Sequence, residues 1–152
     1  MDVLALYDAH KNMVYRLALS YLKSVPDAED AVQQVFLRLI EHRGRIVPGK
    51  ERSWLAAVTA NLCRDMLRSA VRRRTEPLTE DIPFETPEEN DVFQAVMALS
   101  DNERAAVYLY YYEGYSTSET ARILGLSQTA VTSRLDRARQ HLRGKLVEVR
   151  YG

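Results

Sequence analysis

The sequence is poor in the residues that build cross-links and metal centres. Its 152 residues include one cysteine, Cys63, and three histidines, His10, His42 and His141, which stand singly and far apart. A single thiol excludes a disulfide framework within the chain and a zinc site built from several thiolates. The histidines form no pair at metal-ligand spacing, and no glycine-rich phosphate loop is present. We therefore expect no metal, no other cofactor and no catalytic centre.

Long apolar runs are also missing. Hydrophobic residues make up 46% of the chain, yet no run approaches the ~18 consecutive apolar residues of a membrane span. The first residues, Met1-Asp2-Val3-Leu4, are acidic rather than basic and no small-residue cleavage site follows them, unlike a secretory signal. The hydrophobic content is too high for a disordered chain. These features predict a folded cytoplasmic protein with one ordinary domain or two very small ones.

The charges cancel overall but are unevenly distributed. Residues 1–75 carry 13 basic and 8 acidic residues, and residues 104–152 carry 8 basic and 4 acidic residues. Residues 76–103 carry 9 acidic residues and no Lys or Arg. Two basic parts on either side of an acidic one suggest a polyanion as the partner. On charge alone, Lys and Arg that merely solvate helix faces are equally compatible with this pattern.

Prolines mark a boundary near the middle of the chain. Pro77, Pro83 and Pro87 fall within the acidic stretch, and each proline removes a helical hydrogen bond and favours extended geometry at the residue before it. We therefore predict a linker over residues 76–91 that joins domains at residues 1–75 and 92–152.

Both domains are expected to be helical. Apolar residues recur at helical spacing over residues 2–23, 27–44 and 53–74, and no window alternates convincingly with a period of two. Asp27 is placed to cap the second of these helices. The fold class is therefore predicted to be all-α. The second helix is expected to bury Ala28, Ala31, Val32, Val35, Phe36, Leu39 and Ile40.

The spacing of Ala121, Gly125 and Val131 is typical of a helix-turn-helix. A small residue allows the helices to cross, glycine makes the turn, and Val131 is the buried foot of a recognition helix over residues 128–146, which Ser127 is placed to cap. Short polar side chains in the first half of this helix suit base edges, and arginines along it suit phosphates. The pattern alone also fits a helical hairpin that merely packs.

The chain resembles a bacterial RNA polymerase sigma factor of the extracytoplasmic-function (ECF) group of the sigma-70 family. The resemblance covers about residues 4–75 and 92–147. It rests on segments that follow one another in the expected order: Ala28–Leu39 and Trp54–Arg68 in region two, then Ala98–Arg104, Tyr112–Ser116 and Thr129–Arg139 in region four.

This resemblance implies roles for two helices of region two. Four residues spaced i, i+3, i+4 and i+7 would dock on the clamp helices of the polymerase β′ subunit; without the resemblance, they are a solvated face with a stray leucine. The next helix would hold the melted −10 strand, and Asp65 is expected to pair with an arginine. The loop before it lacks aromatic residues, so Ile46 and Val47 would wall the pocket of a flipped base. The polymerase-binding set is Asp30, Gln33, Gln34 and Leu37, and the −10 set is Asn61, Arg64, Arg68 and Arg72.

In region four, the resemblance assigns the reading of duplex −35 DNA to the recognition helix. Arg137 is suited to a bidentate contact with guanine. Asp136 would either accept from a cytosine or only orient Arg137 or Arg139. The tyrosines between Tyr108 and Tyr115 are expected to pack in the core and at the domain edge. The complete −35 set is Arg122, Gln128, Thr129, Thr132, Ser133, Arg134, Asp136 and Arg137, among which Arg122, Gln128 and Arg134 are the phosphate candidates.

The resemblance implies a two-domain initiation factor that is not an enzyme, because the polymerase supplies the chemistry. Its expected partners are core RNA polymerase, through the β′ clamp helices and the β flap, promoter DNA at the −10 and −35 elements, and an anti-sigma factor. The expected location is the cytoplasm, where the anti-sigma factor would hold the protein at the membrane. The alternatives are a helix-turn-helix regulator that acts without polymerase and an anti-sigma or sigma-mimicking interaction protein.

Overall fold

The computed structural model describes the backbone of residues 2–73 and 95–151, and side chains within residues 2–69, 95–100 and 103–144. All regular elements of these parts are helical, so the predicted all-α class is confirmed. The chain divides into two compact units, residues 1–80 and 81–152, and each is described by itself. The predicted linker over residues 76–91 lies outside the described residues.

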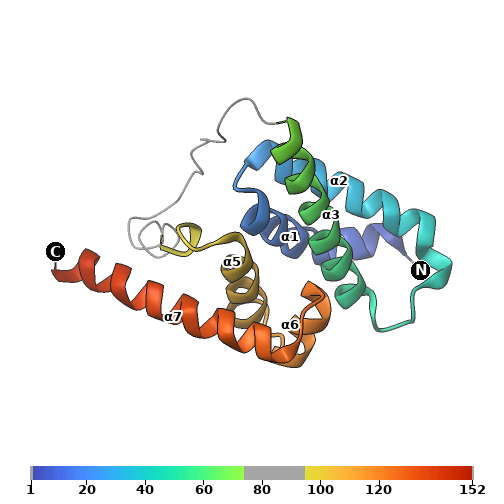
Figure 1. The fold of residues 1–152 in the computed structure, drawn as a ribbon. Coiled ribbons are helices and arrows are strands. Elements are labelled where there is room, and N and C mark those ends of the chain that lie inside the picture. The colour runs from blue at the N-terminus through green and yellow to red at the C-terminus, as the bar shows by residue number, and fades with distance from the viewer. Residues whose placement is uncertain (1, 74–94, 152) are drawn as a thin grey trace. The chain divides into compact units, whose positions relative to one another are not determined.

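The N-terminal unit is a three-helix bundle of α1 (Val3–Leu22), α2 (Val25–His42) and α3 (Glu51–Arg73), which pack against one another (Figure 1). The Asp2 side chain caps α1 by accepting from the Ala5 N–H at 3.1 Å. The core is formed by apolar side chains at helical spacing. Its completely buried members are Val14, Leu17, Ala18, Ala28, Ala31, Val35, Leu39, Leu55, Ala56, Ala60 and Cys63.

Two predicted helix starts in this unit are wrong. Ser24, rather than Asp27, caps α2, because the Ser24 Oγ accepts from the Asp27 N–H at 3.3 Å and Pro26 lies in the first turn, where its missing N–H costs nothing. The third helix begins at Glu51, two residues earlier than expected. The Glu51 carboxylate accepts from the Gly49 N–H at 3.1 Å and carries a negative charge at the positive end of the helix dipole.

Ile40 was also assigned wrongly to the core, since it is 45% exposed. It lies at the edge of the apolar stripe of α2, one residue beyond the completely buried Leu39. Helix α2 then passes into a 3₁₀ turn, η1 (Arg43–Arg45), which contains the Gly44 at which the helix was expected to end.

The C-terminal unit contains α5 (Asp101–Val107), a π-helical turn η2 (Tyr108–Tyr112), α6 (Thr117–Leu124) and α7 (Gln128–Tyr151). Helices α5 and α6 both pack against α7 (Figure 1). Arg104, only 2% exposed, donates from Nη1 to the carbonyls of Met97 and Leu99, so that α5 holds the segment before it. The completely buried residues of this unit include Ala105, Ala106, Leu109, Val131 and Ala138.

Candidate nucleic-acid interface

A helix-turn-helix is formed by α6 and α7. Ser116 and Glu119 make a reciprocal capping box at the start of α6: the Ser116 Oγ accepts from the Glu119 N–H, and the Glu119 carboxylate accepts from the Ser116 N–H, both at 3.0 Å. Gly125 ends α6 in the left-handed region, with φ of 70°. The predicted cap of α7 is confirmed, because the Ser127 Oγ accepts from the Ala130 N–H at 3.1 Å.

The two faces of α7 differ as the sequence predicts. Val131, Leu135 and Ala138 are at most 1% exposed and pack inward. Thr129, Thr132, Ser133, Asp136 and Arg137 are all exposed, and so is Arg122 on α6, whereas Arg134 is half-buried. An outward face of short polar side chains at the start of a helix can approach base edges, so the arrangement fits a recognition helix.

Two of the predicted −35 residues, Gln128 and Thr132, also make hydrogen bonds within the helix-turn-helix. The Gln128 amide donates to the Thr117 Oγ1 at 2.9 Å, which ties the first turn of α7 to the first turn of α6. The Thr132 hydroxyl donates to the Gln128 carbonyl at 3.0 Å. Both side chains are therefore oriented before any ligand arrives.

A buried carboxylate on α5 contacts two basic side chains on consecutive turns of α7. The Glu103 side chain is 7% exposed, and its Oε2 lies 3.1 Å from His141 Nδ1. Its Oε1 lies 3.7 Å from the Nε of Arg137, whose side chain is 58% exposed. Glu103 could not be recognised from the sequence, because a glutamate in the first turn of a helix is usually explained by the helix dipole.

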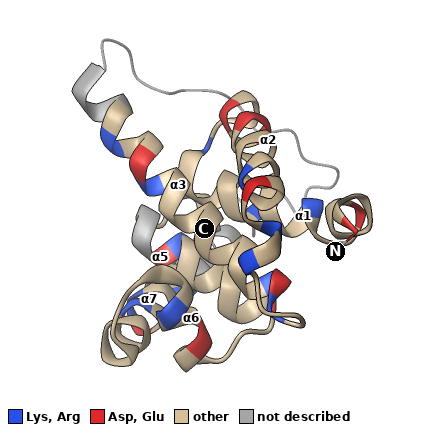
Figure 2. Cartoon of the chain, turned by 90° about the vertical axis from the view of Figure 1, so that its right-hand side faces the viewer, with Lys and Arg blue, Asp and Glu red and all other residues tan. Residues whose placement is uncertain are grey.

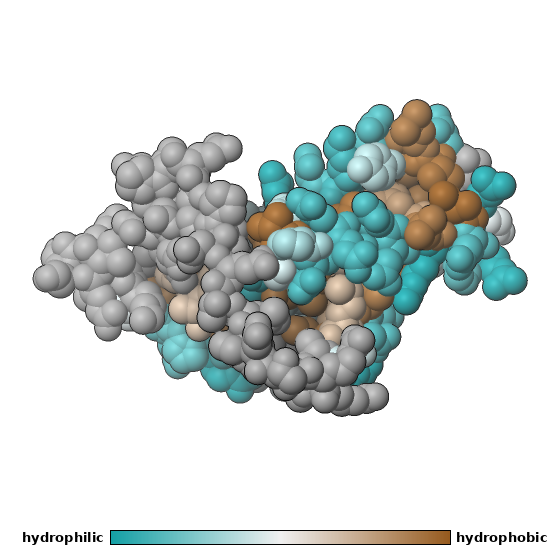
Figure 3. Space-filling view, turned by 90° about the horizontal axis from the view of Figure 1, so that it is seen from above, coloured by the Kyte–Doolittle hydropathy of each residue, from teal (hydrophilic) through white to brown (hydrophobic). Residues whose placement is uncertain are grey.

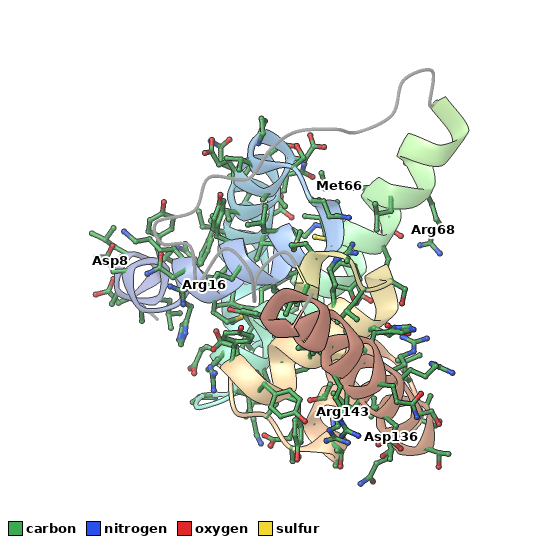
Figure 4. The ribbon with its side chains drawn as sticks, turned by 90° about the vertical axis from the view of Figure 1, so that its left-hand side faces the viewer. Asp8, Arg16, Met66, Arg68, Asp136 and Arg143 are labelled. Carbon is green, nitrogen blue, oxygen red and sulfur yellow. The ribbon has the colours of Figure 1, made fainter. Side chains whose placement is uncertain are left out.

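Asp136 contacts Arg139, one of the two arginines that it was expected to orient. The Arg139 Nη1 lies 2.9 Å from Asp136 Oδ1, and its Nε donates to the Tyr111 hydroxyl at 2.6 Å. These contacts, the tyrosine hydrogen bond first, raise the pKa of Arg139. In Figure 4, Asp136 and Arg143 project outward from α7. Tyr111 is a contact that spacing could not predict, because it comes from the irregular turn η2.

The expected packing of the tyrosines is only partly correct. Tyr108 and Tyr115 are buried, but Tyr111 and Tyr112 are 51% and 61% exposed. The π-helical geometry of η2 alters the angular spacing of the side chains, so neighbouring rings spread over the surface instead of forming one buried stripe.

The exposed face of α3 carries paired polar residues. Arg64 donates to the Asn61 Oδ1, and Arg68 pairs with Asp65, as expected for this aspartate. Arg68 points away from the bundle in Figure 4, and Figure 2 shows residues of both charges close together along this helix. The side chain of Arg72 lies outside the described residues.

The loop between α2 and α3 differs from the expected pocket wall. Ile46 is only 7% exposed and belongs to the core, whereas Val47 is 62% exposed. Ile46 has extended backbone geometry, so the side chains of Ile46 and Val47 point in opposite directions, and of these two only Val47 offers an apolar side chain to a ligand.

The predicted polymerase-binding residues share one side of α2. Asp30, Gln33 and Leu37 are exposed and Gln34 is half-buried, and the Gln34 amide donates to Asp30 Oδ2 at 2.8 Å. Leu37 is 59% exposed. Figure 3 shows hydrophobic surface over this part of the N-terminal unit. The large hydrophobic side chains that are exposed on this unit are Leu4, Tyr7, Leu37, Ile40 and Val47.

The described residues contain no group of three or more Cys, His, Asp or Glu side chains that could hold a metal ion. Burial raises the pKa of the Cys63 thiol to about 12, so it is protonated at neutral pH. No helix in the described parts of the chain has the length and apolar character needed to cross a membrane.

Two family models match the chain. The model for sigma-70 region 2 matches residues 6–73, and the model for sigma-70 region 4 matches residues 90–142. The first covers most of α1 and all of α2 and α3, and the second covers α5, α6 and most of α7. The matches therefore divide between the two compact units.

Curated relatives and a solved structure are similar over nearly the whole chain. The ECF RNA polymerase sigma factor SigE of Mycolicibacterium smegmatis is 36% identical over 152 residues, covering 91% of this chain and 59% of that protein. SigL of Mycobacterium tuberculosis, also an ECF sigma factor, is 34% identical and covers 95% and 89%. The Bartonella quintana sigma factor RpoE, solved with the anti-sigma factor NepR, has a similar fold, with a TM-score of 0.83, 22% identity and coverage of 95% and 96%. The chain thus spans about three fifths of the first relative's length.

Proposed function

Because the chain belongs to the ECF group of RNA polymerase sigma factors in the sigma-70 family, we propose that it binds core RNA polymerase and directs promoter-specific initiation of transcription. The observation that carries this proposal is the exposed polar face of α7 on a packed helix-turn-helix. The polymerase supplies the chemistry of RNA synthesis, and the chain supplies no catalytic group. It works in the cytoplasm, where polymerase and promoter DNA meet.

The N-terminal unit binds the polymerase through α2. The contact is made by Asp30, Gln33, Gln34 and Leu37, with the clamp helices of the β′ subunit as the partner. The proposal is supported by the exposed Leu37 among polar neighbours, because helix-on-helix interfaces place an apolar anchor inside a polar rim.

The same unit captures the melted −10 strand on α3, through Asn61, Arg64, Arg68 and Arg72. The hydrogen bond from Arg64 to the Asn61 Oδ1 supports this role, because it directs the NH₂ group of the Asn61 side-chain amide away from that arginine. Exposed guanidinium groups suit the backbone of a single strand.

The C-terminal unit reads duplex −35 DNA in the major groove. The bases are faced by Thr129, Thr132, Ser133, Asp136 and Arg137. Among these, Asp136 acts by orienting Arg139. The phosphates are contacted by Arg122, Gln128 and Arg134. We also assign the β flap of the polymerase as a partner of this unit and an anti-sigma factor as a partner of both units. Two readers on one chain gain affinity through their effective concentration.

Run-off transcription with purified core polymerase tests the function. Transcripts from specific promoters should require the full chain. A chain that bound duplex DNA but gave no transcript would instead be a helix-turn-helix regulator, and one that bound polymerase without selecting promoters would be a sigma mimic.

The polymerase contact is tested by Leu37→Asp. Placing a charge at the centre of the proposed interface should weaken binding to core polymerase by about tenfold or more. Leu4→Asp is the matched control, because Leu4 is 70% exposed on α1, outside the proposed contact, and its replacement should leave the affinity unchanged. Equal loss of affinity in both variants, or none in Leu37→Asp, would contradict the assignment to α2. Fluorescence titration of labelled chain with polymerase measures both.

A further inference from the structure

Among the described acidic residues of the C-terminal unit, Glu103 is unusual because its carboxylate is buried. It occupies the third position of α5, where its backbone N–H donates to the Ser100 Oγ. Glu119 holds the same position in α6, and its carboxylate turns back to the cap residue of its own helix. The carboxylate of Glu103 instead reaches across to α7. It therefore has a role beyond capping.

The two partners of Glu103 are spaced four residues apart on α7, so they lie on one face in consecutive turns. Oε1 is 3.7 Å from Arg137 Nε and Oε2 is 3.1 Å from His141 Nδ1. The carboxylate is 7% exposed, but the two partner side chains are 58% and 62% exposed. The buried carboxylate of Glu103 thus contacts the inward-facing nitrogens of Arg137 and His141, whose side chains extend to the surface.

The contact with Arg137 is made at Nε, the guanidinium nitrogen nearest the backbone. A bidentate contact with guanine uses two guanidinium nitrogens in a fixed geometry. Holding the guanidinium at its inner edge restricts its rotation while most of the side chain remains open to solvent. Because an arginine side chain otherwise loses much rotamer freedom on binding, this restraint favours the base that fits one orientation.

We propose that Glu103 is a positioning residue for −35 recognition, which sets the orientation of the Arg137 guanidinium through a buried carboxylate. This inference rests on the proposed function, because it assigns the direction of a base-reading side chain. Glu103 itself does not touch DNA. It strengthens the base preference at the one base pair that Arg137 contacts. Its negative charge also lowers the affinity of this surface for DNA of any sequence.

The competing explanation is that Glu103 only fastens α5 to α7. The two contacts of Glu103 distinguish these roles. Both the contact with Arg137 and the contact with His141 would fasten α5 to α7, but only the first can orient Arg137. A fastening role predicts equal effects at every base pair, together with a lower Tm. A positioning role predicts a change at one base pair only.

The test uses the full chain with core polymerase and promoters randomised over the −35 element, and counts transcripts by sequencing. Glu103→Gln keeps the shape of the side chain and removes its charge. It should reduce discrimination by about two- to tenfold at one base pair, the one whose discrimination Arg137→Ala abolishes. Binding to non-promoter DNA should rise in the same variant. Added to Arg137→Ala, Glu103→Gln should leave the sequence preferences unchanged.

His141→Gln is the matched control, since it removes the second partner of Glu103 and spares Arg137. Its sequence preferences should equal those of the wild type, with any change confined to Tm. The positioning proposal is overturned if Glu103→Gln leaves the preferences unchanged, weakens all positions equally, or matches His141→Gln in its effect. If the wild type itself selects no promoters, the proposed function fails, and this inference fails with it.

Discussion

At the scale of single residues, two arginines of α7 contact partners that are distant in the sequence. Arg139 is held by Tyr111, 28 residues earlier, as well as by its neighbour Asp136. Arg137 is held by Glu103 on α5. Arginines of one helix therefore differ in how far they are restrained before DNA binds, and the more restrained ones are better suited to reading than to general attraction.

Cys63 provides a prediction about pH. Its thiol pKa is raised from 9.0 to about 12 because burial penalises the thiolate. Between these values the unfolded chain loses the proton and the folded chain keeps it, so the free energy of unfolding should fall as the pH rises. The contribution is at most about 1.4 kcal/mol per pH unit. Urea unfolding at pH 8 and pH 10 measures it.

The control for this experiment is Cys63→Ala, which removes the titrating group from the completely buried position. The free energy of unfolding of this variant will be lower at both pH values because of the cavity. The decrease in its free energy of unfolding from pH 8 to pH 10 should be smaller than the decrease in the wild type. Identical losses in the two proteins would show that the thiol does not contribute.

Burial could be predicted for residues at the centre of an apolar helical stripe, but not for residues at its edges. Val35 lies at the centre of the apolar stripe of α2 and is buried as predicted, whereas Ile40 lies at the edge of the same stripe and is exposed. Periodicity gives the direction of a side chain, but the position of the neighbouring helix decides whether an edge residue is covered. The cluster around Glu103 could not be predicted for the same reason.

At the scale of elements, the helix ends depend on side chains that compete for the same backbone groups. Ser24 and Asp27 are both good caps by residue type, and the chain uses Ser24. Placing the cap at Ser24 lets Pro26 enter the first turn and leaves Asp27 to interact with the helix dipole. Residue preferences therefore located the helix, but not its first residue.

Gly125 provides the prediction at this scale. With φ of 70° at the end of α6, it adopts a conformation that is costly for any residue with a Cβ. Gly125→Ala should lower the free energy of unfolding by about 1–2 kcal/mol. Thermal or urea unfolding gives the value.

Gly44→Ala is the matched control. Gly44 lies in η1, does not have a positive φ, and a Cβ added there meets nothing within 4 Å. Its replacement should therefore leave stability unchanged or slightly raise it. If Gly125→Ala were as well tolerated as Gly44→Ala, the turn would not depend on glycine.

At the scale of the whole molecule, opposite charges cancel in number but not in place. With 21 residues of each sign, the chain has no net attraction for DNA, so binding must come from local basic surface. The uneven distribution was visible in the sequence, and so were the all-α class and the helix-turn-helix. The segment over residues 76–91 was assigned from its prolines and acidic residues alone.

A salt titration tests the local origin of DNA binding. Arg122 is exposed on α6 and is assigned to a phosphate, so Arg122→Ala should reduce the slope of log affinity against log salt by about 0.9 for the polymerase-bound chain on promoter DNA. The loss should be the same for all −35 sequences. Filter binding at several salt concentrations measures the slope.

Arg16→Ala serves as the control because it removes the same charge from an exposed position on α1 (Figure 4). Its salt dependence should match that of the wild type. An equal reduction in both variants would mean that the effect follows the total charge of the chain and not a phosphate contact at the helix-turn-helix.

The π-helical turn η2 has a consequence for chain length. Such a turn holds more residues than an α-helical turn of the same rise. A homologue with one residue deleted between Ala106 and Gly114 would run through this point as regular α-helix, and its aromatic hydroxyl would no longer reach the arginine equivalent to Arg139. Insertions and deletions at this point should therefore accompany changes in the residues at positions 111 and 139, which makes alignment gaps here informative about promoter preference.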